Sequence, residues 1–359
     1  MIELQDVINQ FGAEFLKTHT LSPVQAKAFH AIGNCRTSVL GAHVDVCDEC
    51  GFEKISYNSC RNRHCPKCQT VTKEQWVEKQ NQYLLNSGYF HVVFTLPDEL
   101  NSIMLRNQSV TYGLLFKAVS ETLLELCADK KFLGAKPGVT TVLHTWGQNL
   151  MFHPHVHCIV TGGGLTKDGK WQDSRKKFFL PVKVLSRKFR GKFLFLLKQA
   201  GLLFDSALYQ TEWVVYCKPP FNNASKVIEY LGRYTHRVAI SNNRIWALKD
   251  GKVTFSYRDY RDNSKKKTMT VTAVEFIRRF MLHVLPSGFR KIRHYGILAA
   301  RDKSERISLC KKLTRTKFRA AYHTTVLERL CKMLGVDFNL CPCCGIGRLA
   351  RASPNEATE

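Results

Sequence analysis

The sequence predicts an α+β protein in which a central antiparallel sheet is flanked by helices. Three observations predict this class. Short apolar, β-branched runs bounded by turn residues recur between residues 91 and 271, and segments with helical spacing lie before, between and after them. The composition also changes along the chain, because its first part is rich in cysteine and its last part is strongly basic.

The composition excludes several classes of protein. The 359 residues include 54 Lys plus Arg against 29 Asp plus Glu, a formal net charge of +25, and 44% are hydrophobic. This apolar content is enough for a sizeable core, which excludes a disordered or fibrous chain. Because the positive charge is spread along most of the sequence, we expect a folded surface that meets nucleic acid. A protein that is merely soluble and basic is the alternative.

No membrane or export signal is expected. The N-terminus carries acidic residues and no apolar run, and the most apolar stretch, Phe193 to Phe204, is interrupted by Lys198 and is too short to span a bilayer. We therefore expect a cytoplasmic protein with no membrane partner. In that reducing compartment, fourteen cysteines favour metal ligation over disulfides.

Local signals place the elements in chain order. A capping box of Ser22 with Gln25 opens a short helix through Ala31, and a second one of Thr272 with Glu275 opens a helix through about Leu285. Residues 71–86 have helical spacing. The segment Cys35–Cys68 is too irregular for a strand or a helix and is typical of a chain folded around metal. Val139–Trp146 and Val156–Val160 are expected to form an antiparallel pair of strands, and Trp213–Tyr216 is a strand closed by Pro219 and Pro220. Further helices are expected at 99–128 and 225–234. The other expected strands are His91–Pro97, Val238–Ile240, Ile245–Leu248, Val253–Tyr257 and Met269–Val271.

Two Cys-x2-Cys pairs lie in the N-terminal segment, at Cys47 and Cys50 and, fourteen residues on, at Cys65 and Cys68. Each such turn presents two sulfurs to one ion, so these four cysteines predict one tetrahedral site for structural Zn²⁺. Four further residues could replace a ligand or build a second site, but are as readily explained as buried thiols or phosphate contacts: Cys60, His64, Cys35 and His43.

A further knuckle lies near the C-terminus, where Cys341 and Cys344 form half of a zinc ribbon whose partner pair is not evident in the sequence. A reduced cysteine cluster is the alternative there. These patterns predict three consecutive domains: a zinc-binding, DNA-binding domain at 1–86, a sheet domain at 87–285, and a basic helical C-terminal region at 286–359 that contains the knuckle.

His155 and His157 flank Val156 in one of the expected strands. Alternate residues of a strand share a face, so the two imidazoles point the same way and form half of a metal site. A structural or phosphate-contacting pair is the alternative. The site needs a third ligand, and the candidates are Gln148, across the expected hairpin, and then His153 and His144.

Tyr230 and Tyr234 are four residues apart in an expected helix, which places both phenols on one face. Gly232 between them costs the helix about 1 kcal/mol relative to Ala, which is understandable if a ligand approaches the backbone there. Core packing is the usual role of such a pair. This tyrosine pair, however, has neighbours that could provide positive charge to a phosphate and a phenolate: Arg233, His236 and Arg237.

An ordered series of motifs through nearly the whole chain resembles the IS ninety-one family of rolling-circle insertion-sequence transposases, which are two-tyrosine HUH endonucleases. The series is Arg63–Pro66, Val93–Pro97, His144–Gln148, His153–Cys158 with Gly162–Gly164, Lys218–Phe221, Tyr230–Ile240 and Arg293–Gly296. The resemblance implies that the sheet domain is an HUH endonuclease, that His155 and His157 hold a catalytic divalent ion, and that Tyr230 and Tyr234 are the nucleophiles.

The implied activity is a metal-dependent single-strand DNA endonuclease and strand transferase, acting in DNA transposition. Mg²⁺ or Mn²⁺ would act as Lewis acid and template, and the family pattern implies a 5′-phosphotyrosine and a free 3′-hydroxyl, so that no ATP is required. The expected partners are single-stranded or hairpin transposon ends in the bacterial cytosol and nucleoid.

Basic residues alternate with aromatic ones in the C-terminal third, where cations can contact phosphates and rings can stack on unpaired bases. For any one residue, a solvated charged face is the ordinary role. Beside the cations around the tyrosines, the DNA-binding candidates are Lys265, Lys266 and Arg293.

Three alternatives stay open. A plasmid or phage replication initiator would use the same chemistry. A non-catalytic zinc-finger DNA-binding protein would not need the two tyrosines. A zinc hydrolase that uses His153, His155 and His157 would cleave small esters without forming a protein–DNA adduct.

Overall fold

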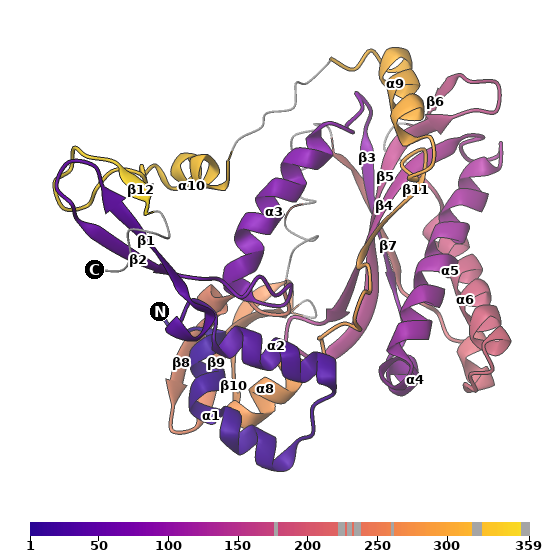
Figure 1. Ribbon diagram of the computed structural model, residues 1–359. Coiled ribbons are helices and arrows are strands. Elements are labelled where there is room, and N and C mark those ends of the chain that lie inside the picture. Colours follow the sequence, from indigo (N-terminus) through magenta and orange to yellow (C-terminus); the bar gives the residue numbers. More distant parts are fainter. Residues whose placement is uncertain are drawn as a thin grey trace. The chain divides into compact units, whose positions relative to one another are not determined.

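The computed structural model describes residues 1–175, 179–221, 227, 232, 238–259, 262–317 and 325–352 (Figure 1). These residues form two compact units. The first unit combines Met1–Gln75 and Ile240–Val284 with the described residues after 320, and the second combines the described residues of 76–239 and 285–320. The division therefore differs from the consecutive ranges 1–86, 87–285 and 286–359 expected from the sequence, because strand pairing brings together segments that are distant along the chain.

The second unit is built on one antiparallel sheet with the strand order β11-β4-β5-β3-β7, to which β6 adds beside the end of β5. Its strands are β3 Tyr89–Thr95, β4 Lys136–Trp146, β5 Phe152–Leu165, β6 Trp171–Asp173, β7 Val215–Phe221 and β11 Ile292–Gly296. The predicted antiparallel pairing of Val139–Trp146 with Val156–Val160 is confirmed as β4 and β5. The α+β class with a central antiparallel sheet is confirmed as well.

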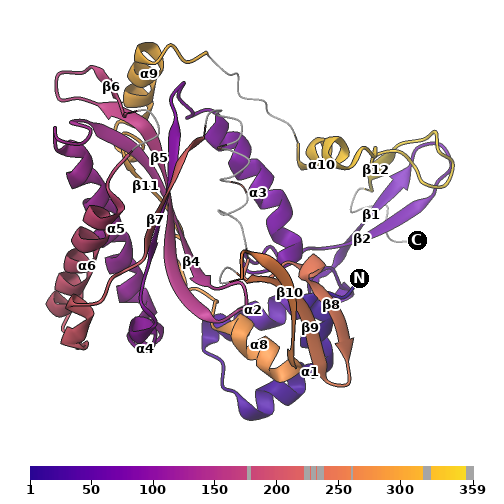
Figure 2. The same cartoon turned by 180° about the vertical axis from the view of Figure 1, so that it is seen from behind.

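Helices α5 and α6 cover one face of this sheet (Figures 1 and 2). Among the residues that the structure describes, the unit contains α4 Asn101–Arg106, α5 Gln108–Ala128, α6 Val182–Gln199 and α9 Lys303–Leu313, together with the end of α3. Phe94 of β3 meets Phe189 of α6 with ring centroids 5.0 Å apart, and both rings are fully buried. Burial of each such ring contributes about 1.5–3 kcal/mol, so this contact identifies the face of the sheet that belongs to the hydrophobic core.

Two strands of the second unit differ from their sequence prediction. β7 continues through Pro219 and Pro220, which were expected to end it. This is possible because β7 is an edge strand and has a hydrogen-bonded neighbour on one side only. A proline there can lack its N–H group without depriving a second neighbouring strand of a hydrogen bond. β11 comes from the region that was expected to be helical, and it pairs with the outer side of β4.

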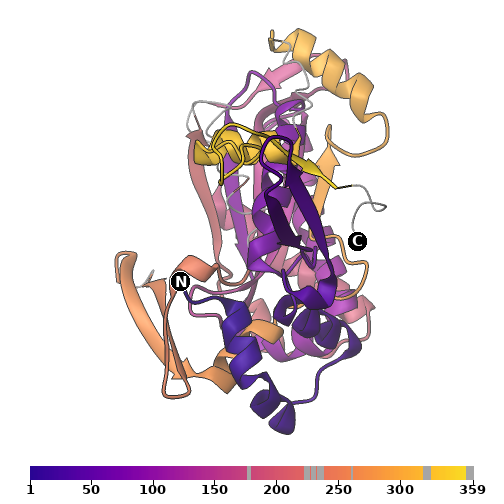
Figure 3. The same ribbon diagram turned by 60° about the vertical axis from the view of Figure 1, so that its left-hand side comes forward.

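The first unit contains two small sheets and a group of helices. Its helices are α1 Leu4–Thr18, α2 Pro23–Gly33, α8 Ala273–Met281 and α10 Val326–Leu334, and α3 Pro66–Asn81 begins in it. Its strands are β1 Ala42–Cys47, β2 Glu53–Tyr57, β8 Ile245–Lys249, β9 Lys252–Asp259, β10 Lys265–Thr272 and β12 Leu349–Arg351, in the orders β12-β1-β2 and β10-β9-β8. Figure 3 shows β12 beside the β1–β2 hairpin, although about 300 residues separate them along the chain.

Several local predictions can be compared with this unit. The capping box of Ser22 with Gln25 is present. At Thr272 only half of the expected capping box forms: the hydroxyl accepts the Glu275 N–H, whereas the Glu275 carboxylate pairs with Arg278 and Arg279. The expectation of an irregular Cys35–Cys68 segment is wrong, because this segment contains the β1–β2 hairpin and the start of α3. Val238–Ile240 is not a strand. Most of the expected helix 225–234 lies outside the described residues.

Within the ranges that the structure describes, no helix has the length and apolar character needed to cross a membrane.

Candidate active site

Three imidazoles meet on one face of the second unit's sheet: His144, His155 and His157. Strand register explains why. His144 of β4 lies directly opposite His155 of β5, and His157 lies two residues further along β5 on the same face. One ring nitrogen from each side chain lies within 4.8 Å of those of the other two, a spacing at which all three could bind one ion. We call this set the histidine cluster.

The histidine cluster lies on the face of the sheet opposite α6. His157 lies opposite Val93 of β3, and the next residue of β3, Phe94, points the other way and packs on α6. His144 is buried, whereas His155 and His157 are partly exposed. The cluster therefore has the access that a ligand needs and the rigid support of three paired strands.

Hydrogen bonds orient two of the three rings. The Nδ1 atom of His155 lies 2.7 Å from the carbonyl oxygen of His153, to which it can donate only as Nδ1–H. In the neutral ring, this tautomer has its lone pair on Nε2, the form in which imidazole binds a metal. The Nδ1 atom of His157 lies 2.9 Å from Nε2 of His91, and these two rings are stacked with centroids 5.1 Å apart.

His91 is a supporting residue that the sequence motifs did not reveal. Its side chain is only 3% exposed, and burial, followed by the charge of Lys218, lowers its pKa to about 3. His91 is therefore neutral at physiological pH, and one of the two facing nitrogens carries a proton for the bond to His157. The sequence did contain a signal for this role. His91 lies three residues before Phe94, and an odd spacing in a strand places two side chains on opposite faces, so His91 lies on the face of the histidine cluster.

The other predicted ligands have different surroundings. Gln148, the first candidate for the third ligand, lies in the turn between β4 and β5 and stays a candidate. Among the described His, Cys, Asp and Glu side chains, His144 is the one that meets His155 and His157. The Nδ1 atom of His153 lies 3.5 Å from the Asp98 carboxylate in an exposed pair. The predicted nucleophiles and their cationic neighbours lie outside the described residues: Tyr230, Tyr234, Arg233, His236 and Arg237.

The remaining DNA-binding candidates fall in both units. Lys266 in β10 of the first unit lies 4.7 Å above the ring of Trp246, whose surface is about half exposed, and Lys265 forms an exposed ion pair with Asp262. Arg293 in β11 of the second unit stacks on Phe116 of α5 at 4.3 Å, on the helical side of the sheet. The structure therefore does not bring these three cations together in one unit.

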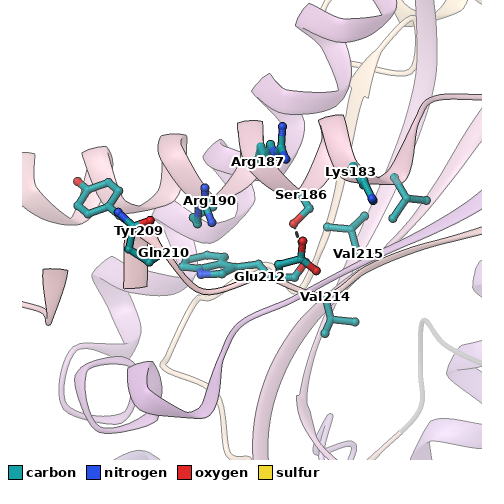
Figure 4. Close-up of a pocket in the computed structure, with 11 residues that line it drawn as sticks. Lys183, Ser186, Arg187, Arg190, Tyr209, Gln210, Glu212, Val214 and Val215 are labelled. Atoms are coloured by element: carbon teal, nitrogen blue, oxygen red, sulfur yellow. Dashed lines mark hydrogen bonds between the residues drawn. The ribbon is translucent and has the colours of Figure 1, made fainter. Parts of the chain in front are cut away.

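A groove with a cavity volume of about 560 Å³ lies on the helical side of the second unit, between α6 and residues 209–215 (Figure 4). Lys183, Arg187 and Arg190 follow one side of α6 along it, and Glu212 is the acidic residue among those that line it. The Ser186 hydroxyl donates to the Trp213 carbonyl oxygen at 2.6 Å, which holds the two walls together. The groove is basic and lies on the opposite face of the sheet from the histidine cluster.

The first cysteine cluster consists of Cys35, Cys60, Cys65 and Cys68. The Cys68 sulfur lies 3.6 Å from those of Cys35 and Cys60, and the Cys65 sulfur lies 3.6 Å from that of Cys35. Zn–S bonds of about 2.3 Å in a tetrahedron place sulfurs about 3.8 Å apart. These donors therefore fit one Zn²⁺ ion. Hydrogen bonds from Cys60 and Cys65 lower the pKa of the Cys68 thiol, whereas hydrogen bonds with Cys60 and Cys68 raise the pKa of the Cys65 thiol.

The four cysteines predicted to share one zinc ion are not brought together. Cys65 and Cys68 lie in the first cysteine cluster, whereas Cys47 and Cys50 meet Cys341 and Cys344 in a second cysteine cluster. The physical reason is that the β1–β2 hairpin turns its knuckle toward the strand β12 that pairs with it. His64 is not among the donors of either cluster, and its Nε2 lies 3.4 Å from Nε of Arg63.

Comparisons with known proteins identify relatives over most of the chain. The family described as "Putative transposase" matches residues 138–306, and the family described as "Transposase zinc-binding domain" matches residues 7–96. A Sinorhizobium fredii protein named "Putative transposase y4qJ" is 44% identical, over 97% of this chain and 94% of its own length. The "Transposase for insertion sequence element IS801" of Pseudomonas savastanoi pv. phaseolicola is 29% identical, over 82% of this chain and 75% of its own length.

Two solved structures of the conjugative relaxase TrwC in complex with oriT DNA are also similar, at 10% and 11% identity. They cover 64% and 69% of this chain and 75% and 71% of their own, with TM-scores of 0.26 and 0.25.

Proposed function

Because this chain belongs to the IS ninety-one family of transposases, we propose that it moves its DNA element by cleaving and rejoining single strands through a 5′-phosphotyrosine intermediate. The observation that carries this proposal is the histidine cluster, which lies within the residues that match the transposase family. The substrate is single-stranded or hairpin DNA at the ends of the element. The protein acts where that DNA is, in the bacterial cytosol.

The histidine cluster fits one catalytic divalent ion by the chemistry and spacing of its donors. When bound, such an ion supplies Lewis-acid stabilisation to the phosphodiester. Mg²⁺ prefers oxygen ligands in near-octahedral geometry, so we expect Mn²⁺ to serve better than Mg²⁺. The contacts of His155 with His153 and of His157 with His91 keep the two imidazoles in the orientation that binding needs.

Tyr230 or Tyr234 supplies the attacking oxygen. Its phenolic oxygen forms a bond to phosphorus, the bond from phosphorus to the 3′ oxygen breaks, and the leaving oxygen takes a proton to become the 3′-hydroxyl. One phosphoester replaces another, so the step can run backward and rejoin strands without ATP. A phenol has an ordinary pKa near 10, and Arg233, His236 and Arg237 are cations close enough in sequence to favour the phenolate.

The experiment that tests this function is a search for the covalent adduct. Full-length protein is incubated with Mn²⁺ and labelled single-stranded oligonucleotides, including the ends of the element, and then resolved on a denaturing gel. We expect a protein–DNA adduct that mass spectrometry maps to Tyr230 or Tyr234 and that EDTA prevents. Tight DNA binding without an adduct on any oligonucleotide would instead support the non-catalytic zinc-finger alternative.

His91→Phe is expected to weaken divalent-ion binding by about 10- to 100-fold, because the stacked ring is kept but the nitrogen facing His157 is lost. Titration of Mn²⁺ into the protein, followed by electron paramagnetic resonance, measures this directly. His294→Gln is the matched control, since His294 bonds Thr140 on the same face of the sheet and is expected to leave Mn²⁺ affinity unchanged. Equal affinities for wild type and His91→Phe would refute the supporting role.

The basic groove beside α6 is proposed as a path for the DNA backbone. Arg187→Glu is expected to weaken binding of single-stranded DNA and to reduce the slope of log affinity against log salt by about one for each phosphate that the variant no longer neutralises. Fluorescence anisotropy between about 50 and 200 mM salt measures both effects. Lys198→Glu makes the same charge change at an exposed position of α6 that does not line the groove. Equal salt slopes in the two variants would remove the groove from the DNA path.

A further inference from the structure

We propose that the second cysteine cluster, formed by Cys47, Cys50, Cys341 and Cys344, is a structural zinc site that joins the β1–β2 hairpin and residues 341–351 into one zinc ribbon. The matched families end at residues 96 and 306, so neither includes Cys341 or Cys344. The site concerns the assembly of the first unit and goes beyond the strand transfer proposed above.

The two halves of the ribbon are built in the same way. Each is a Cys-x2-Cys-Gly knuckle, Cys47–Gly51 in one half and Cys341–Gly345 in the other. The Gly51 N–H donates to the Cys47 carbonyl oxygen at 3.2 Å, and the Gly345 N–H donates to that of Cys341 at 3.0 Å. Both glycines have a left-handed backbone, with φ of +69° and +70°, which glycine adopts without strain. The sequence therefore forms the same ligand-presenting turn twice.

The sulfur geometry fits a tetrahedral ion. The Cys47 sulfur lies 3.8 Å from that of Cys344, and the Cys50 sulfur lies 3.7 Å from that of Cys341. All four sulfurs lie within 4.8 Å of one another, close to the roughly 3.8 Å edge of a zinc–thiolate tetrahedron. The backbone N–H groups of Cys343 and Gly347 donate to the Cys341 and Cys344 sulfurs at 3.4 and 3.3 Å, and hydrogen bonds of this kind stabilise a thiolate.

Contacts around the sulfurs hold the two knuckles in one register. β12 pairs with β1 so that Leu349 lies opposite Cys47. Asp48 and Arg348 are joined twice, by the Asp48 N–H to the Arg348 carbonyl oxygen at 3.1 Å and by the Arg348 N–H to the Asp48 carboxylate at 2.6 Å. A Cβ atom on Gly347 would collide with the Cys47 sulfur, so only glycine permits this approach. The second knuckle is therefore shaped to fit the first.

A zinc ion at this site would close a very long loop. Cys47 and Cys344 are 297 positions apart in the sequence, and β12 has only three residues to hold β1. Closing a long loop costs conformational entropy, and metal binding to a site that is absent from the unfolded chain offsets such a cost. The ribbon can assemble only after Cys341 and Cys344 have been synthesised, so completion of the first unit depends on a segment that lies about 300 residues after the β1–β2 hairpin.

Alkylation of native, zinc-loaded wild-type protein tests the site without any mutation. Cys50 and Cys343 are both exposed, but only Cys50 belongs to the cluster. We expect iodoacetamide to modify Cys343 at least about tenfold faster than Cys50, because a zinc-bound thiolate is a weaker nucleophile and is held in place. A chelator should then expose Cys47, Cys50, Cys341 and Cys344 together. Equal rates at Cys50 and Cys343 before chelation would overturn the proposal.

Zinc content distinguishes one shared site from two separate ones. We expect Cys341→Ser with Cys344→Ser to lose one zinc ion per full-length chain, and Cys47→Ser with Cys50→Ser to lose one as well. The variant with all four substitutions should still lose only one, and Cys343→Ser should lose none. An unchanged zinc content in the Cys341/Cys344 variant would refute the shared site. A loss of two ions in the variant with all four substitutions would refute it as well, provided that the first cysteine cluster is still protected from alkylation.

Discussion

Replacing both Tyr230 and Tyr234 by Phe is expected to abolish the covalent protein–DNA adduct, lowering its formation by at least about 1,000-fold. The substitution removes the attacking phenolic oxygens and keeps the rings. The measurement is adduct formation on labelled single-stranded DNA with Mn²⁺, together with DNA affinity at the same salt concentration. DNA affinity should change little, because aromatic rings that could stack on bases are retained.

The controls separate the roles of the two tyrosines. Tyr209→Phe removes a phenol from the groove on the helical side of the sheet and should leave the adduct unchanged. If either tyrosine can attack first, each single variant should still cleave one strand but fail to produce the rejoined product. An undiminished adduct in the double variant would show that another group is the nucleophile.

His157→Ala is expected to lower the rate of strand cleavage by about 100- to 1,000-fold and to remove its dependence on Mn²⁺ concentration. His157 contacts both His144 and His91, so its loss disrupts the donor set as well as its support. Single-turnover cleavage measured over a series of Mn²⁺ concentrations gives both quantities. Chelation of the wild-type protein by EDTA should reproduce the loss, and added Mn²⁺ should restore only the wild type.

His153→Ala is the matched control, because it removes an imidazole of the same strand that pairs with Asp98 and is not part of the histidine cluster. It should keep most of the cleavage rate, whereas an equal loss would favour the alternative site of His153, His155 and His157.

The third ligand is decided by a second pair of variants. We expect His144→Ala to weaken Mn²⁺ binding more than Gln148→Ala does, and the reverse order would restore Gln148 as the ligand.

Much of the fold follows from signals that act over a few residues. A helix cap depends on one side chain and the N–H group three positions on, which is why the caps at Ser22 and Thr272 agree with their prediction. The β-rich composition of Val139–Trp146 and Val156–Val160 and the short linker between them likewise predicted an antiparallel pair. The side chains of His155 and His157 share a face because the strand period is two.

Edge position and pairing partners could not be predicted in this way. Whether a strand tolerates Pro219 and Pro220 depends on which of its sides has a neighbour, and the sequence does not specify this. The same holds for β11. Its residues lie in a region that was predicted to be basic and helical, and they form a strand because they pair with β4. Sheet membership is a property of two segments, so neither segment reveals it alone.

Residue types and short spacings predicted zinc at paired cysteines and a divalent ion at a histidine pair, and a series of motifs indicated the transposase family. Tertiary structure decided which of these groups meet. His144 reaches His155 through the β4–β5 register, and Cys47 and Cys50 reach Cys341 and Cys344 through the pairing of β1 with β12. Spacing along the chain limits only nearby contacts, whereas strand pairing can join residues 297 positions apart.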